Sequence, residues 1–127
     1  MHAPPPDIVL VGHEWNPRAL LRAELIENGF EVLATDTWPD ARRHLLGGTM
    51  PRLVVVDLQA LPDPEMVLSE VKVLAGPQRL LVLTAAATLT REQIQQFTPN
   101  VLARPVTIET IVATAARLAG QAKRTDH

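Results

Sequence analysis

Residues 53–66, LVVVDLQALPDPEM, give the clearest indication of the fold. Four apolar residues lead into Asp57, and a loop with two prolines follows. A short run that is apolar throughout is typical of a strand buried on both faces of a parallel sheet. A carboxylate at the end of such a strand is either a solvated strand terminus or part of a functional site, and the rest of the sequence has to distinguish the two.

The same kind of run recurs along the chain. Most of these runs are continuous rather than alternating, which again indicates strands covered on both faces. They are DIVLVG (7–12), FEVLAT (30–35), LVVVD (53–57), RLLVLT (79–84) and NVLAR (100–104).

Helical segments with recognisable start and stop signals separate these runs. The first is predicted to begin at Pro17 with Asn16 as its cap and to end before Gly29. Thr90 followed by Gln93 resembles a capping box that opens a short fourth helix, which Pro99 terminates. The other three are predicted at 39–46, at 65–75, and at 108–118 with Thr107 as cap and Gly120 as stop.

Five alternations of strand and helix predict an α/β fold with a five-stranded parallel sheet and helices on both faces. A chain of 127 residues is the size of one domain. We expect a disordered lead at residues 1–6, one domain at 7–120, and a polar tail or linker stub at 121–127.

Composition excludes several classes of function. The net charge of −2 comes without a basic cluster, so a nucleic-acid surface is not expected. The chain has no cysteine, and its apolar runs are strand-length, which excludes disulfides and leaves no membrane span. The start MHAPPPD is unlike a signal peptide, and we expect a cytoplasmic protein with no membrane partner.

Polar residues follow the predicted strands at one edge of the sheet. In a doubly wound sheet, ligands gather outside the carboxyl ends of the strands. GHEWN (12–16) follows the first strand, Asp57 ends the third, Thr84 ends the fourth, and Arg104 with Pro105 ends the fifth. Carboxylate, hydroxyl and guanidinium groups are therefore expected to meet at this carboxyl edge.

At these residues the sequence resembles the receiver domains of two-component response regulators. The resemblance runs through IVLVGHEWNPRALLRAELIENGFEV, LVVVDLQALPDPE, LLVLTAAA and VLARPVTIETIVATAARL. It implies a flavodoxin-like (βα)5 fold, with Asp57 as the residue that accepts a phosphoryl group from a histidine kinase. It also implies that Thr84 contacts the phosphoryl oxygens, and that Arg104 and Pro105 stand where receivers carry a lysine and a cis-linked proline.

The departures from the receiver pattern concern the metal site. Receivers hold Mg²⁺ with the acceptor aspartate and an acidic pair after the first strand, and the matching residues here are Gly12 and His13. Neither supplies the hard oxygen ligand that Mg²⁺ prefers. Glu14 and Asp57 remain as candidate ligands, so Mg²⁺ is possible although no cofactor is required. A guanidinium at Arg104 could instead pair with Asp57 directly, without a metal.

The conformational switch is also altered. The loop before Pro62 carries an extra residue, and Val101 stands where receivers have the aromatic residue that rotates on activation.

Each candidate residue also has a purely structural interpretation. Asp57 could be a solvated strand end, Thr84 a cap and Arg104 a solvated cation. His13 follows the first strand as a histidine does in some cobalamin modules, but the flanking Val11 and Asn16 do not fit their signature. No glycine-rich nucleotide-binding motif is present.

Two hypotheses follow from the resemblance. The chain is an atypical receiver that signals through protein–protein interaction, with a kinase or other signalling protein or with a second copy of itself through the fourth helix, fifth strand and fifth helix. Alternatively, it is a conventional receiver phosphorylated on Asp57 with Mg²⁺. An enzyme is not expected, because no base and nucleophile pair is evident, and a small-ligand-binding flavodoxin-like module is a third alternative.

Overall fold

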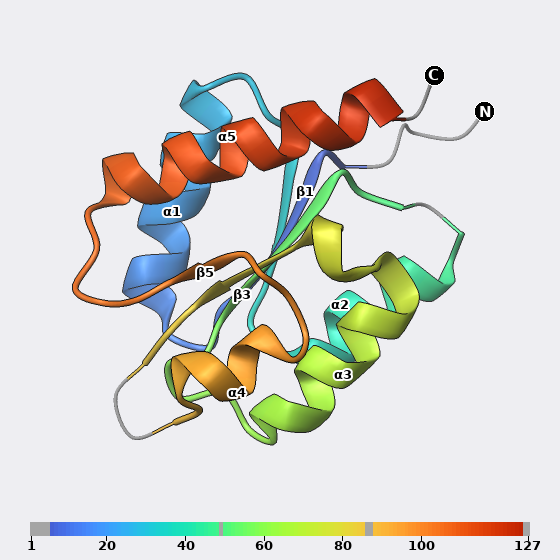
Figure 1. The fold of residues 1–127 in the computed structure, drawn as a ribbon. Coiled ribbons are helices and arrows are strands. Elements are labelled where there is room, and N and C mark those ends of the chain that lie inside the picture. The colour runs from blue at the N-terminus through green and yellow to red at the C-terminus, as the bar shows by residue number, and fades with distance from the viewer. Residues whose placement is uncertain (1–5, 49, 86–87, 126–127) are drawn as a thin grey trace.

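The computed structural model describes residues 6–48, 50–85 and 88–125, with side chains as far as residue 121. Within these residues a five-stranded sheet lies between two layers of helices (Figure 1). Residues 1–5 of the predicted lead lie outside the described residues.

The order of elements along the chain confirms the predicted alternation of strand and helix. The strands are β1 (Ile8–Val11), β2 (Val32–Thr35), β3 (Leu53–Asp57), β4 (Leu80–Leu83) and β5 (Val101–Leu102). The helices are α1 (Trp15–Glu27), α2 (Trp38–Leu46), α3 (Pro64–Ala75), the 3₁₀ turn η1 (Pro77–Arg79), α4 (Arg91–Gln95) and α5 (Ile108–Thr125).

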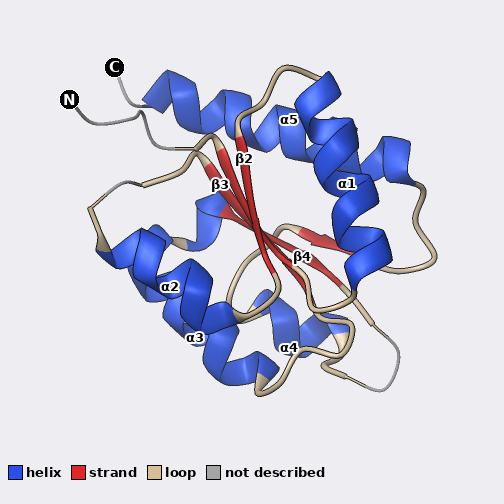
Figure 2. Cartoon of the chain, turned by 180° about the vertical axis from the view of Figure 1, so that it is seen from behind, coloured by secondary structure: helices blue, strands red, loops and turns tan. Residues whose placement is uncertain are grey.

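All neighbouring strands in the sheet are parallel, in the order β2-β1-β3-β4-β5. Successive side chains of a strand point to opposite faces. In β3, Val54 and Val56 pack under α2, α3 and α4, whereas Leu53 and Val55 pack under α1 and α5. This division explains why the strand is apolar throughout, and Figure 2 shows the two helical layers on either side of the strands.

Two helix boundaries differ from the predictions. Helix α1 begins at Trp15, and Asn16 lies inside its first turn rather than capping it. Pro17 is tolerated there because the first four backbone N–H groups of a helix have no partner within it. Helix α5 continues through Gly120 to Thr125, so residues 121–125 of the predicted tail are helical. A glycine without a left-handed φ does not end a helix by itself.

The caps predicted for the last two helices are confirmed. The Thr90 hydroxyl accepts from the Gln93 backbone while the Gln93 side chain accepts from the Thr90 backbone, and the Thr107 hydroxyl accepts from the backbone N–H of Thr110. Helix α4 nevertheless ends at Gln95, well before Pro99. Among the described residues, none of the helices combines the length and the apolar character needed to cross a bilayer.

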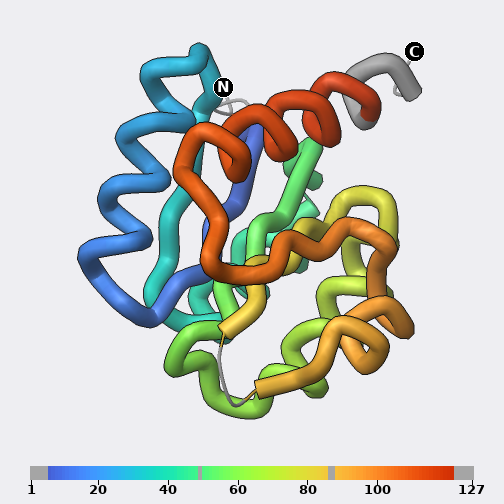
Figure 3. Tube along the Cα trace, turned by 60° about the vertical axis from the view of Figure 1, so that its left-hand side comes forward, coloured from blue at the N-terminus to red at the C-terminus, as the bar shows by residue number. Residues whose placement is uncertain are grey.

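The fold places the carboxyl ends of β1, β3 and β4 at one edge. The chain trace in Figure 3 shows the loops that follow these strands gathered on the same side of the molecule, opposite the two termini. Residues far apart in the sequence therefore meet there.

Candidate functional site

Asp57 lies at the carboxyl edge with its carboxylate almost fully buried. It is the last residue of β3 and is only 5% exposed. Strand β4 lies beside β3 and pairs Leu83 with Asp57, so Thr84 follows directly next to it. Strand β5 pairs Leu102 with Leu83, which brings Arg104 to the same place. The ends of three neighbouring strands thus place Asp57, Thr84 and Arg104 close together, as the sequence predicts.

The Arg104 guanidinium holds the Asp57 carboxylate in a bidentate ion pair. Arg104 Nη1 donates to Asp57 Oδ1 at 2.8 Å, and Nη2 donates to Oδ2 at 2.8 Å. Two parallel charge-assisted hydrogen bonds of this kind are the strongest that a side-chain pair makes. The pair balances a charge that would otherwise be costly to bury.

Thr84 fixes Arg104 at both its backbone and its side chain. The Thr84 hydroxyl oxygen accepts from the Arg104 backbone N–H at 2.9 Å, and the Thr84 carbonyl accepts from Arg104 Nη1 at 2.7 Å. Nη1 therefore bridges Asp57 and Thr84. The peptide bond between Arg104 and Pro105 is cis.

A backbone donor completes the contacts of Asp57. Oδ1 also accepts from the backbone N–H of Gln59 at 3.0 Å, which closes a turn two residues after the aspartate. Both carboxylate oxygens are therefore engaged.

The loop after β1 borders this pair, and its acidic residue, Glu14, is exposed. Gly12 is buried, and a Cβ built on it would lie 3.8 Å from Asp57 Cβ and 3.5 Å from Arg18 Cβ. Arg18, on α1, donates through Nη1 to the Gly12 carbonyl at 2.7 Å and to the His13 carbonyl at 3.3 Å. A second guanidinium thus fixes the position where the receiver pattern has its acidic pair.

Solved structures of receiver domains superpose on this chain over most of their length. A response regulator receiver domain from Clostridium thermocellum superposes with a TM-score of 0.77 at 18% identity, over 93% of this chain and 97% of that chain. A CheY-like receiver domain from Methanospirillum hungatei gives 0.74 at 16%, over 93% and 97%. The chain has the receiver-domain fold. A structure described as an adenylate cyclase from Rhodopirellula baltica gives 0.77 at 20%, over 94% of this chain and 90% of that chain.

Other comparisons limit the conclusions that this structural likeness supports to the fold. No protein-family model matches the sequence, and no curated protein matches it significantly. NtrX from Brucella abortus gives a TM-score of 0.74 at 21% identity, over 96% of this chain and 28% of that chain. At such identities the likeness establishes the fold, and the chemistry of the site rests on its own residues.

The side chains of this receiver fold do not fit a magnesium site. In the described ranges, no group of three or more His, Asp or Glu side chains is placed to hold a metal. Glu14 and His13 are exposed, and Gly12 has no side chain. Both carboxylate oxygens of Asp57 accept hydrogen bonds from Arg104. Mg²⁺ requires several oxygen ligands in near-octahedral geometry.

A depression of about 750 Å³ opens beside the pair on the side of β4 and β5. Thr84 and Arg104 are among the residues that line it, and Asp57 is not. The guanidinium side of the pair is therefore accessible, while the carboxylate lies behind it. The lining residues are Gln59, Ala60, Thr84, Ala85, Leu89, Arg91, Ala103, Arg104 and Pro105.

The structure brings together most of the residues singled out in the sequence. Asp57, Thr84 and Arg104 are in direct contact, with Gly12 and Pro105 next to them. Sequence reasoning missed Gln59 and Arg18. An aspartate at the end of a strand often forms a turn with the residue two positions on, which could have indicated Gln59; the sequence carries no comparable signal for Arg18.

Proposed function

We propose that this chain is an atypical receiver module of a signalling system, and that it works through protein–protein contact rather than through phosphorylation of Asp57. The observation that carries the proposal is the bidentate pair between Arg104 and Asp57. The proposal assigns the chain no catalysis of its own.

The pair opposes phosphorylation for two chemical reasons. A carboxylate that attacks phosphorus needs a free oxygen lone pair with room for the phosphoryl group in line with it. Here Oδ1 accepts two hydrogen bonds, from Arg104 and from Gln59, and Oδ2 accepts one from Arg104. Only Oδ2 keeps an open lone pair, and the guanidinium lies directly beside it. Transfer depends further on positioning and on metal-borne charge, and within the described part of the chain no three His, Asp or Glu side chains are placed to hold a metal.

The same contacts oppose a conformational switch. By resemblance, the Thr84 hydroxyl would turn toward a phosphoryl oxygen in an ordinary receiver. Here its oxygen accepts from the Arg104 backbone, and Arg104 is held in turn by Asp57. We infer that the carboxyl edge stays in one arrangement and that the surface offered to a partner is permanent.

The partner surface is proposed from the family resemblance. It comprises α4, β5 and α5; β5 ends two residues before Arg104, and α5 begins four residues after it. A histidine kinase, another signalling protein or a second copy of the chain would bind there.

Conventional phosphorylation is the second candidate, and one observation favours it. Arg104 is 27% exposed, and the depression beside it gives a phosphodonor access to its guanidinium. If Arg104 rotated away from Asp57, it could bind the phosphoryl oxygens that replace the ion pair.

Mass spectrometry separates the two candidates. The protein is incubated with Mg²⁺ and a small phosphodonor such as acetyl phosphate, beside an Asp57→Asn variant. We expect no mass increase corresponding to a phosphoryl group in either protein. An adduct on the parent chain that the variant lacks would overturn the proposal in favour of phosphotransfer.

A conservative variant shows whether Arg104 is the cause. Arg104→Lys keeps the charge and removes the bidentate fork. If the pair blocks the reaction, this variant gains an adduct that the parent chain lacks, provided that Asp57 is intact. An adduct in neither protein would leave the missing metal ligands as the dominant obstacle.

A further inference from the structure

A second concavity lies at the carboxyl edge, separate from the ion pair. Its volume is about 360 Å³, within the roughly 300–1,000 Å³ typical of small-molecule sites. None of Asp57, Thr84 and Arg104 lines it. The lining residues are His13, Asp36, Thr37, Trp38, Pro39, Leu61, Pro62, Asp63, Met66 and Val67.

The topology of the sheet favours a ligand at this position. The chain runs from β1 to one neighbour, β2, and then crosses back to β3 on the other side of β1. Ligands of doubly wound sheets bind outside the carboxyl ends of the strands where the order reverses in this way. The cavity is built from the loops that follow β1, β2 and β3.

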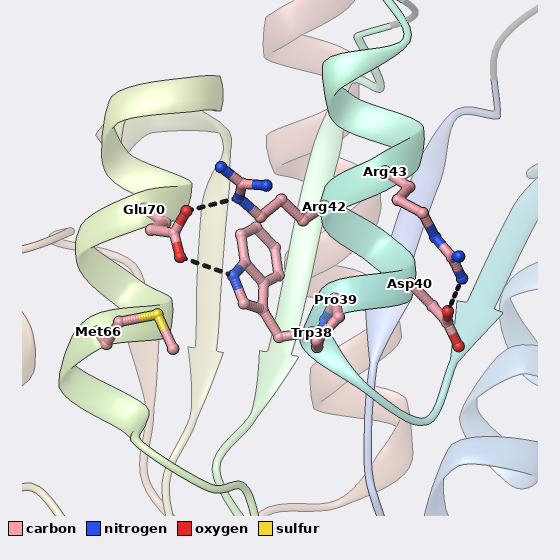
Figure 4. Close-up of a pocket in the computed structure, with 7 residues that line it drawn as sticks. All are labelled: Trp38, Pro39, Asp40, Arg42, Arg43, Met66 and Glu70. Atoms are coloured by element: carbon pink, nitrogen blue, oxygen red, sulfur yellow. Dashed lines mark hydrogen bonds and ion pairs between the residues drawn. The ribbon is translucent and has the colours of Figure 1, made fainter.

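The walls of the cavity are apolar and held in place. Trp38, Leu61 and Val67 line it and are buried. Figure 4 shows how the Trp38 indole is fixed between α2 and α3, because Nε1 donates to Glu70 Oε1 at 3.2 Å. Glu70 is itself held by Arg42, whose Nε donates to Oε2 at 2.7 Å. A preformed wall lowers the cost of ordering when a ligand binds.

Two carboxylates lie at the cavity. Asp36 and Asp63 are exposed, and neither side chain makes a hydrogen bond or ion pair with the described residues. Asp63 precedes α3 with a left-handed φ of 49°, and its side chain does not cap the helix. The carboxylate that would ordinarily satisfy a helix N-terminus is left beside the cavity instead.

We propose that this cavity binds a small organic cation with an apolar body, of the arylalkylamine class. The apolar walls take the body of the ligand. The ammonium group pairs with Asp36 and Asp63, and an indole wall adds cation–π attraction where the charge approaches it. The inference does not depend on the state of Asp57.

Binding is tested with tryptamine and its neutral analogue tryptophol. The ¹⁵N-labelled full chain is titrated with each, and the backbone amide signals of residues 36–38, 61, 63 and 65–67 are followed by NMR. Tryptamine is expected to shift these signals saturably, and tryptophol to bind at least about fivefold more weakly, because it lacks the charge that the two carboxylates would pair with.

Variants identify the groups that recognise the charge. Asp36→Asn with Asp63→Asn is expected to weaken tryptamine binding about fivefold or more and to leave tryptophol unchanged. Asparagine keeps the side-chain size and tolerates the left-handed backbone at residue 63. The control, Glu27→Gln with Glu109→Gln, changes the net charge equally at exposed sites away from the cavity and should bind as the parent does.

The proposal is overturned by any of three results. These are the absence of saturable shifts with tryptamine, equal binding of tryptamine and tryptophol, and shifts that the Asp36 and Asp63 substitutions leave unchanged.

Discussion

At the scale of single residues, the site is governed by one guanidinium in place of several carboxylates. Arg104 meets both oxygens of Asp57, and Arg18 holds the backbone of Gly12 and His13. A planar fork recognises a carboxylate in a geometry that an ammonium group cannot reproduce. Asp57 is therefore the partner of a fixed cation, and by the proposal above it is neither a metal ligand nor a nucleophile.

The effect of Asp57→Asn on stability tests this role of Asp57, because its expected sign differs between an ion-pair site and a site of clustered carboxylates. Asp57→Asn should lower the free energy of unfolding by about 1–3 kcal/mol, because a largely buried guanidinium loses its counterion. In a site of clustered carboxylates the same change relieves repulsion and stabilises the fold. Urea unfolding monitored by circular dichroism measures the difference.

A matched control accompanies that measurement. Asp36→Asn alters an exposed carboxylate without hydrogen bonds to the described residues, and it should change stability by no more than about 0.5 kcal/mol. A stabilising effect of Asp57→Asn would show that the ion pair does not dominate the site.

At the scale of elements, the helix ends distinguish two kinds of glycine. Gly120 lies inside α5, and a Cβ there would meet no atom within 4 Å. Gly120→Ala should therefore stabilise the protein by about 0.5–1 kcal/mol. Gly29 follows α1 with φ +93°, and Gly29→Ala should destabilise it by about 1 kcal/mol.

Thermal or urea unfolding of the two alanine variants provides the comparison. Equal effects of the same sign would contradict the helical extent of α5 or the left-handed turn after α1.

The stability contributed by the contact between α2 and α3 is expected to depend on pH through Glu70. Hydrogen bonds from Arg42, and then from Trp38, lower the pKa of Glu70 below its ordinary value of 4.5. A lowered pKa in the folded state adds stability that is complete above the unfolded value and is lost as the pH falls through the folded value. The free energy of unfolding of the parent chain should thus exceed that of Glu70→Gln by a constant amount well above pH 4.5. This difference should shrink as the pH falls through that value and below it.

Unfolding curves of both proteins across this range test the expectation. An advantage that grows as the pH falls would contradict it, and so would one that does not change. Trp38→Phe, which removes one of the two donors, should reduce the effect without abolishing it.

Most of the fold could be predicted from the sequence, because strands that are buried on both faces consist of apolar residues. Strands β1, β3 and β4 are buried on both faces, and their runs are apolar throughout. Capping residues such as Thr90 and Thr107 act locally, so they too were readable. The start of α1 and the end of α5 were not, because Asn16 and Gly120 are compatible with positions inside a helix as well as at its ends.

The candidate site was predictable in part. Residues that end neighbouring parallel strands must meet, which placed Asp57, Thr84 and Arg104 together. The expected direct pairing of Arg104 with Asp57 is present in the structure. Other hydrogen bonds depend on side-chain conformations, so the contacts of Arg18 and the bond from Gln59 to Asp57 came only from the structure. The cavity beside Trp38 likewise depends on three loops and has no motif.

At the scale of the whole molecule, the receiver-domain fold is combined with a carboxyl edge at which Arg104 pairs with Asp57. The five-stranded sheet and both helical layers are complete. The changes are confined to the carboxyl edge, where Gly12, His13 and Arg104 replace groups that the receiver pattern uses for metal and phosphate. This separation of an intact scaffold from an altered site is what we expect of a binding module.

The most direct test of this account is a Mg²⁺ titration followed by NMR of the amide signals of Asp57, Gln59 and Arg104. A Gly12→Asp, His13→Asp, Arg104→Lys variant serves as the positive control, because it supplies two carboxylates and removes the guanidinium fork. A Cβ at residue 12 would meet its nearest neighbours at ordinary van der Waals distances of 3.5–3.8 Å. We predict no saturable shift in the parent chain at millimolar Mg²⁺ and a clear one in the variant. Saturable Mg²⁺ binding at Asp57 of the parent chain would contradict the account.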